Sequence, residues 1–211
     1  WIPDNYMVIG KAQFLKHDFW TALETFQYVA STYKEHPTHY EGLIWLMQTQ
    51  MQLGKMADAE YLLDFLKNEK NLPKKYKPLF AAVAADFHIK KENYPKAIEQ
   101  LKVAVVLAKK RADRIRYSYI LAQLYQKTDS NEKAFALYKK VIKMNPEYEM
   151  AFNAKINRAR SFDVNSAEGA KVKEELMKML KDEKNVDYLD QIYYALASIA
   201  LIEKDTTKGF N

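Results

Sequence analysis

The chain has 211 residues, 48% of them hydrophobic, and its 33 basic and 27 acidic side chains give a formal net charge of +6. It contains no cysteine, which excludes disulfide bonds, thiol catalysis and thiolate metal sites. It has only five glycines and six prolines, and no window approaches 18 consecutive apolar residues, so the composition favours an all-helical domain that does not span a membrane.

A short polar segment that ends in a small residue recurs along the chain. Its copies are His17–Ala22, Gly54–Ala59, Glu92–Ala97, Asp129–Ala134 and Lys204–Gly209. The first four closing residues follow at intervals of 37, 38 and 37, and the last lies 75 residues further on, which is two periods. This period predicts an array of helix pairs that bury their apolar faces against one another.

Apolar residues recur every three and four positions on both sides of these segments, which predicts a helix A, a tight turn and a helix B in each unit. In the fifth unit Asp163–Ser166 replaces the tight turn. The predicted repeats are 3–37, 38–74, 76–111, 113–146, 147–183 and an incomplete 186–211, with its helix A over 188–203 and its helix B barely begun. Because that last apolar helix lacks a partner, we interpret residues 1–211 as a single domain from a longer protein.

The pattern resembles the tetratricopeptide repeat, in which bulky, small and aromatic residues recur at fixed positions around the turn. The first unit carries the pattern on Tyr6, Gly10, Phe19, Ala22, Phe26 and Pro37, and the fourth on Leu121, Ala122, Tyr125, Ala134, Tyr138, Val141 and Pro146. The resemblance implies an all-α, right-handed superhelix of antiparallel helix pairs, about five and a half repeats long. It also implies a concave groove, lined by the A helices, that binds protein partners.

The family's groove positions transfer to this chain by register. They fall on Glu41, Ile44, Gln48, Met51 and Gln52, then on Leu79, Ala82, Asp86, Ile89 and Lys90, on Arg116, Tyr119, Gln123, Gln126 and Lys127, and on Gln191, Tyr194 and Ser198. The fifth unit has no clear register, but Asn153, Asn157 and Arg160 form a polar face opposite Phe152, Ile156 and Ala159.

Amide side chains in this stripe offer both a donor and an acceptor to a peptide backbone. The stripe therefore predicts a peptide-binding groove. The alternative for any single position is an ordinary solvent-facing helix residue. The version of the groove that clamps chaperone C-termini does not fit, because Met7 and Lys11 stand where its first lysine and asparagine would be.

Candidates for chemistry are few. His36 and His39 lack a third metal ligand nearby, and His88 occupies a position where the family places a packed tyrosine. No phosphate-binding loop, nucleophile elbow or zinc-protease motif occurs. We therefore expect no enzymatic activity, no cofactor and no metal.

Two basic runs, Lys74–Lys77 and Lys109–Arg111 with Arg114 and Arg116, raise nucleic-acid binding as an alternative. Acidic residues interrupt any continuous basic surface, and the runs fit a loop and a helix end. We therefore expect protein partners and no nucleic acid.

Two segments, 145–160 and 189–201, resemble the PorW/SprE lipoproteins of the Bacteroidota type IX secretion system and gliding machinery. This resemblance implies a scaffold on the periplasmic face of the outer membrane that links secretion subcomplexes, held by a lipid anchor outside this chain. The alternative is a generic tetratricopeptide adaptor, cytoplasmic or envelope-located, that binds a peptide or helix in its groove.

Overall fold

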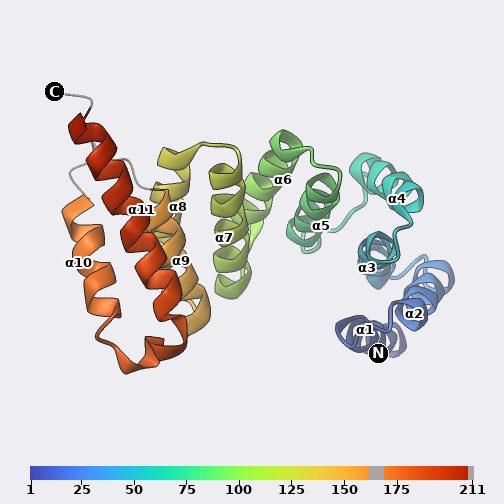
Figure 1. Ribbon diagram of the computed structural model, residues 1–211. Coiled ribbons are helices and arrows are strands. Elements are labelled where there is room, and N and C mark those ends of the chain that lie inside the picture. Colours follow the sequence, from blue (N-terminus) through green and yellow to red (C-terminus); the bar gives the residue numbers. More distant parts are fainter. Residues whose placement is uncertain (162–168, 209–211) are drawn as a thin grey trace. The chain divides into compact units, whose positions relative to one another are not determined.

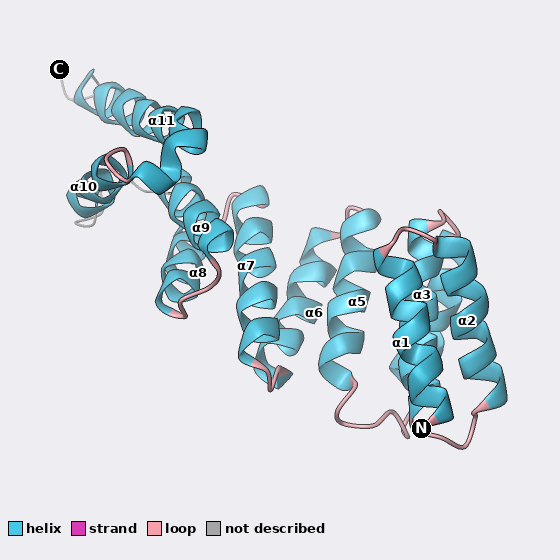
Figure 2. Cartoon of the chain, turned by 90° about the horizontal axis from the view of Figure 1, so that it is seen from below, coloured by secondary structure: helices cyan, strands magenta, loops and turns pink. Residues whose placement is uncertain are grey.

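The computed structural model describes residues 1–161 and 169–208, and every regular element in these residues is a helix (Figure 1, Figure 2). The chain divides into two compact units, Trp1–Ala108 and Lys109–Asn211. The first contains α1 (Ile2–Leu15), α2 (Phe19–Thr32), α3 (Thr38–Gln52), α4 (Met56–Asn68), α5 (Lys77–Lys90) and α6 (Tyr94–Leu107). The second contains α7 (Arg111–Lys127), α8 (Asn131–Lys143), α9 (Tyr148–Arg160), α10 (Gly169–Met179), the 3-10 helix η1 (Glu183–Tyr188) and α11 (Leu189–Lys208).

The tight turns lie where the recurring segments predict them. Each begins with a residue in the left-handed region, namely His17, Gly54, Glu92 and Asp129, at φ angles of 62°, 75°, 56° and 54°. The next residue's N–H donates to a carbonyl five residues earlier, as from Asp18 to Gln13 at 3.0 Å and from Ser130 to Tyr125 at 2.8 Å. These bonds satisfy carbonyls at the end of each A helix and reverse the chain into the B helix. The helix–turn–helix unit is confirmed for the first four repeats.

The small residue that closes each turn is buried. Ala22, Ala59, Ala97 and Ala134 have no exposed surface. Gly10 serves the same close packing, since a Cβ added there would lie 2.6 Å from the Phe26 ring. Such contacts leave no room for a larger side chain without moving a helix.

Each unit has its own core. In the first, α2 packs against α1 and α3 around the fully buried side chains of Phe26, Ile44 and Met47. In the second, Tyr138 and Val141 are buried among α7, α8 and α9, and Leu176, Ile192 and Ile199 join α10 and α11 to α9. Apolar faces at the helical period thus account for the packing of both units.

The C-terminal region differs from the sequence prediction. Residues 204–208, predicted as a turn, continue α11 to Lys208, so that prediction is wrong. The predicted turn Asp163–Ser166 lies outside the described residues. None of the described helices is both long and apolar enough to cross a bilayer.

Candidate functional site

Thirteen of the polar and aromatic groove positions are the predicted partner-binding residues, and all of them lie on the first helix of a pair, here called an A helix. They are Gln48 and Gln52 on α3, Asp86 and Lys90 on α5, Arg116, Tyr119, Gln123 and Lys127 on α7, Asn153, Asn157 and Arg160 on α9, and Gln191 and Tyr194 on α11. All are exposed or half-buried in their unit. Each unit therefore presents its own A-helix face.

In the first unit part of this face is already covered. Ile44 has no exposed surface and Met51 is only 3% exposed, so their placement in the groove is wrong. Both residues belong to the core cluster of this unit, in which α1 and α5 each contact α3.

Polar groups on the A helices of the first unit pair with one another. Lys11 of α1 forms an ion pair with Glu41 of α3, and its Nζ lies 5.7 Å from the centre of the Trp45 ring. A ligand here would have to replace these contacts. Fewer hydrogen-bonding groups on the A-helix face of the first unit are therefore available to a ligand.

In the second unit, predicted groove residues from neighbouring A helices meet. The Asn157 side-chain amide of α9 donates to the Tyr119 hydroxyl of α7 at 3.2 Å. Burial raises the pKa of Tyr119, so its phenol remains protonated at neutral pH and can both donate and accept. This bond fixes two adjacent helices of the face relative to one another.

A second contact extends the face to α11. The Arg160 guanidinium lies 5.6 Å from the centre of the Tyr194 ring, within the range of a cation–π interaction. Both side chains are largely exposed, with Tyr194 at 62%. An exposed arginine held over an exposed tyrosine is a pre-ordered pair of the residue types that commonly anchor protein interfaces.

Positive charge predominates at the predicted groove positions of this unit. Those on α7, α9 and α11 include Arg116, Lys127 and Arg160, while the nearby carboxylate of Glu149, one turn before Asn153 on α9, contributes to the raised pKa of Tyr119. The remaining members are amides, tyrosines and a serine, so the face can donate and accept hydrogen bonds next to positive charge. This chemistry suits recognition of a peptide and includes no activated nucleophile.

The histidines have structural surroundings. The His39 Nδ1 atom lies 2.7 Å from the Ala30 carbonyl oxygen, and the His36 Nδ1 atom accepts from the Thr38 N–H at 3.2 Å. Both interactions hold the connection between α2 and α3. Across residues 1–161 and 169–208, no three histidine, aspartate or glutamate side chains gather closely enough to share a metal ion.

Two features of the sites were missed by sequence reasoning. Arg158 is only 9% exposed and pairs with Glu175 of α10, although its position in a polar-rich helix gave no signal of burial. A cavity lined by α4, α5 and α6, which includes His88, was also missed, and only a comparison of equivalent residues in successive pairs could have indicated it.

His88 gives a prediction about pH. Burial lowers its pKa, and the Lys96 and Lys67 ammonium groups lower it further, against the opposing effect of Glu60 and Glu99. The folded state therefore takes up this proton at lower pH than the unfolded state does. We expect stability to fall as the pH drops from about 7 to about 5.

The variant His88→Gln, which has the residue found at the equivalent Gln50, should lose this part of the pH dependence. Urea unfolding of both proteins across the range measures it. Coincident pH profiles would show that His88 does not contribute.

No family model matches the chain, and no curated protein matches it. Solved structures do. MamA is 23% identical with a TM-score of 0.58 over 88% of this chain and 94% of that one. A kinesin light chain-like repeat protein of Podospora anserina is 15% identical with a TM-score of 0.63, covering 96% and 95% of the two chains. A thermophilic tetratricopeptide protein of Thermus thermophilus is 16% identical with a TM-score of 0.55, covering 94% and 99%.

These similarities concern the fold, because all the identities are low. Together with the turns and the buried alanines, they establish an all-helical array of the α-α superhelical class. Within that class, the chain has the fold of tetratricopeptide-repeat proteins.

Proposed function

We propose that this chain is a non-enzymatic scaffold that binds a peptide or helical segment of a partner protein on the A-helix face of its second unit. The observation that carries the proposal is the chain of contacts from Tyr119 through Asn157 on α9 to Arg160 and Tyr194. These contacts order polar and aromatic groups from three successive A helices before any ligand arrives, which lowers the entropy cost of binding.

The charges at the predicted groove positions indicate what kind of partner segment would bind. Arginine and lysine at the predicted positions favour a segment that carries carboxylates, while Tyr194 can receive an apolar or aromatic side chain. The amides of Asn153 and Asn157 can pair with its backbone. We therefore propose an acidic segment with at least one large apolar residue.

The finer proposal is a place in the type IX secretion and gliding machinery, on the periplasmic face of the outer membrane, with a lipid anchor outside this chain. It rests on the resemblance of residues 145–160 and 189–201 to the PorW/SprE lipoproteins. The alternative is a generic adaptor with another partner. Co-purification with an outer-membrane secretion component supports the finer proposal, and exclusive co-purification with a cytoplasmic protein contradicts it.

The binding proposal is tested by replacing Asn153, Asn157 and Arg160 with alanine together. Because the substitutions leave the buried core residues of α9, Phe152, Ile156 and Ala159, unchanged, helicity should persist. Affinity for the co-purified partner, measured by calorimetry, should weaken at least tenfold, since each lost interfacial hydrogen bond costs about 1 kcal/mol or more.

The matched control replaces Glu132, Lys140 and Lys143, exposed residues of α8 in the same unit, and should bind like wild type. A triple α9 variant that is folded and binds like wild type would place the site elsewhere. Loss of helicity in that variant would show that the stripe is structural.

A further inference from the structure

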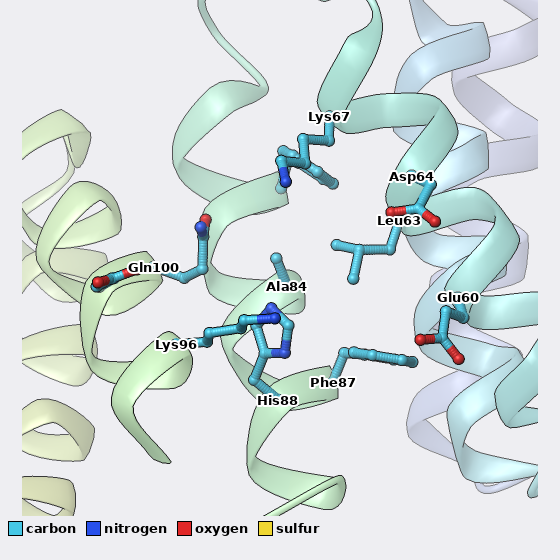
Figure 3. A pocket seen from close by; sticks show the side chains of 11 residues that line it. Glu60, Leu63, Asp64, Lys67, Ala84, Phe87, His88, Lys96 and Gln100 are labelled. Atoms are coloured by element: carbon cyan, nitrogen blue, oxygen red, sulfur yellow. The ribbon is translucent and has the colours of Figure 1, made fainter. Parts of the chain in front are cut away.

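A cavity opens in the first unit between the second and third helix pairs. It measures about 230 Å³ and is bounded by α4, α5 and α6. Its floor is apolar, with Leu63, Ala84 and Phe87 all buried (Figure 3). Its edges are polar, formed by Glu60, Asp64, Lys67, His88, Lys96, Glu99 and Gln100.

The equivalent junction between the first and second helix pairs is closely packed, so the two junctions can be compared residue by residue. There α2 and α3 approach so closely that a Cβ on Gly42 would lie 3.2 Å from Val29 Cγ1 and 3.4 Å from the Ala30 backbone nitrogen. The residue equivalent to Gly42 in the third pair, 38 positions later, is Phe80, and its half-buried side chain lines the cavity. Because a phenyl ring replaces glycine at this point, α4 cannot approach α5 as closely as α2 approaches α3.

Three further substitutions turn the same surface from apolar to polar. The repeat register pairs Leu23 with Glu60, Ala30 with Lys67, and Leu62 with Gln100. The first member of each pair is at most 7% exposed, and the second borders the cavity. Apolar packing is what stabilises neighbouring repeats, so polar replacements at one junction weaken the array there. This loss of packing points to a role other than stability.

The cavity walls carry charges of both signs. Figure 3 shows the carboxylates of Glu60 and Asp64 on one side of the apolar floor and the amino groups of Lys67 and Lys96 on the other. Lys91 pairs with Glu60 at 3.5 Å, but both side chains are about half exposed, and such a pair exchanges readily. A ligand with a cationic end, an anionic end and a short apolar body would satisfy all three surfaces.

We propose that this cavity binds a small zwitterion whose two charged ends are separated by an apolar body, with the chemistry of a dipeptide. Its ammonium group pairs with Glu60 and Asp64, its carboxylate with Lys67 and Lys96, and its side chain rests on Leu63 and Phe87. The cavity volume agrees with a ligand of this size. Sites for drug-sized ligands begin at about 300 Å³, and this cavity is smaller, so it suits a smaller molecule. The site is independent of the A-helix face of the second unit.

The test is a thermal-shift and calorimetric titration of the full chain with L-leucine, L-glutamine, L-lysine and leucyl-leucine. N-acetyl-leucine amide, which lacks both charges, serves as the blocked control ligand. We expect leucyl-leucine to raise the melting temperature by a few degrees, more than any of the single amino acids does, and the blocked compound to leave it unchanged.

The decisive variant, Glu60→Leu with Lys67→Ala and Gln100→Leu, restores the residues of the preceding junction. It should be at least as stable as wild type and bind at least tenfold more weakly. Lys96→Gln is a second variant, expected to weaken binding about tenfold through loss of one charge-assisted bond. The control Glu24→Ala with Lys102→Ala removes one charge of each sign at exposed positions outside the cavity and should bind like wild type.

The proposal is overturned if no zwitterion binds wild type at millimolar concentration, or if the blocked compound binds equally well. It is also overturned if the triple variant, or Lys96→Gln should the triple variant not fold, binds like wild type.

Discussion

Replacing Ala134 with glutamate should unfold the second unit at a temperature where the first remains folded. Ala134 has no exposed surface and lies in a core cluster with Ala122, Tyr138 and Ala154. A carboxylate there would be buried without a partner and would also force α7 and α8 apart, at a cost of about 3 kcal/mol or more. Calorimetry should show the wild-type transition split, with the second unit melting first.

Ala136→Glu is the matched control for this prediction. Ala136 lies two residues further along α8 and is exposed, so the same chemical change should cost little. A change of under about 1 kcal/mol at Ala134 would contradict the close helix crossing that the repeat assignment requires.

Removing Glu175 should be the second most damaging change. The Arg158 side chain is 11% exposed, its Nη2 donates to Glu175 Oε2, its Nε is buried without a hydrogen-bond partner, and its guanidinium lies 5.9 Å from the Phe135 ring centre. Glu175→Ala leaves this buried charge unpaired. Because Glu175 itself is about one-third exposed, we expect a loss of about 2 kcal/mol rather than the full cost of breaking a buried pair.

Adding Arg158→Met to Glu175→Ala should recover most of that loss, since an apolar side chain of similar length fills the space without a charge. Glu174→Ala breaks the exposed pair with Lys178 on the same helix and should leave stability unchanged within error. Equal effects of the Glu174 and Glu175 variants in urea unfolding would show that burial of Arg158 does not matter energetically.

The period and the turns could be predicted from the sequence because they depend on local chemistry. His17, Gly54, Glu92 and Asp129 each end an apolar-periodic helix, and the alanine five residues later marks the helix crossing. Residues 204–208 resemble the turn segments in sequence, but α11 continues through them, so polar composition alone does not predict where the chain turns.

The site was less predictable because it depends on neighbours. Register placed Ile44 and Met51 in a groove, but both are buried in a core cluster that includes residues from neighbouring helix pairs. The polar face of α9 was predicted from its periodicity alone. Its contacts with Tyr119 and Tyr194 required the packing of three A helices, which no single helix sequence specifies.

Site-specific photo-crosslinking in cells tests the central claim, that the A-helix face of the second unit binds a protein partner, most directly. A benzoylphenylalanine at Gln123, exposed on α7, should crosslink one specific protein, whereas the same group at Lys140, exposed on α8, should not. The crosslink at position 123 should also disappear in the Asn153, Asn157 and Arg160 triple variant. An equally strong crosslink to the same protein from position 140, or one that survives the triple variant, would contradict the account.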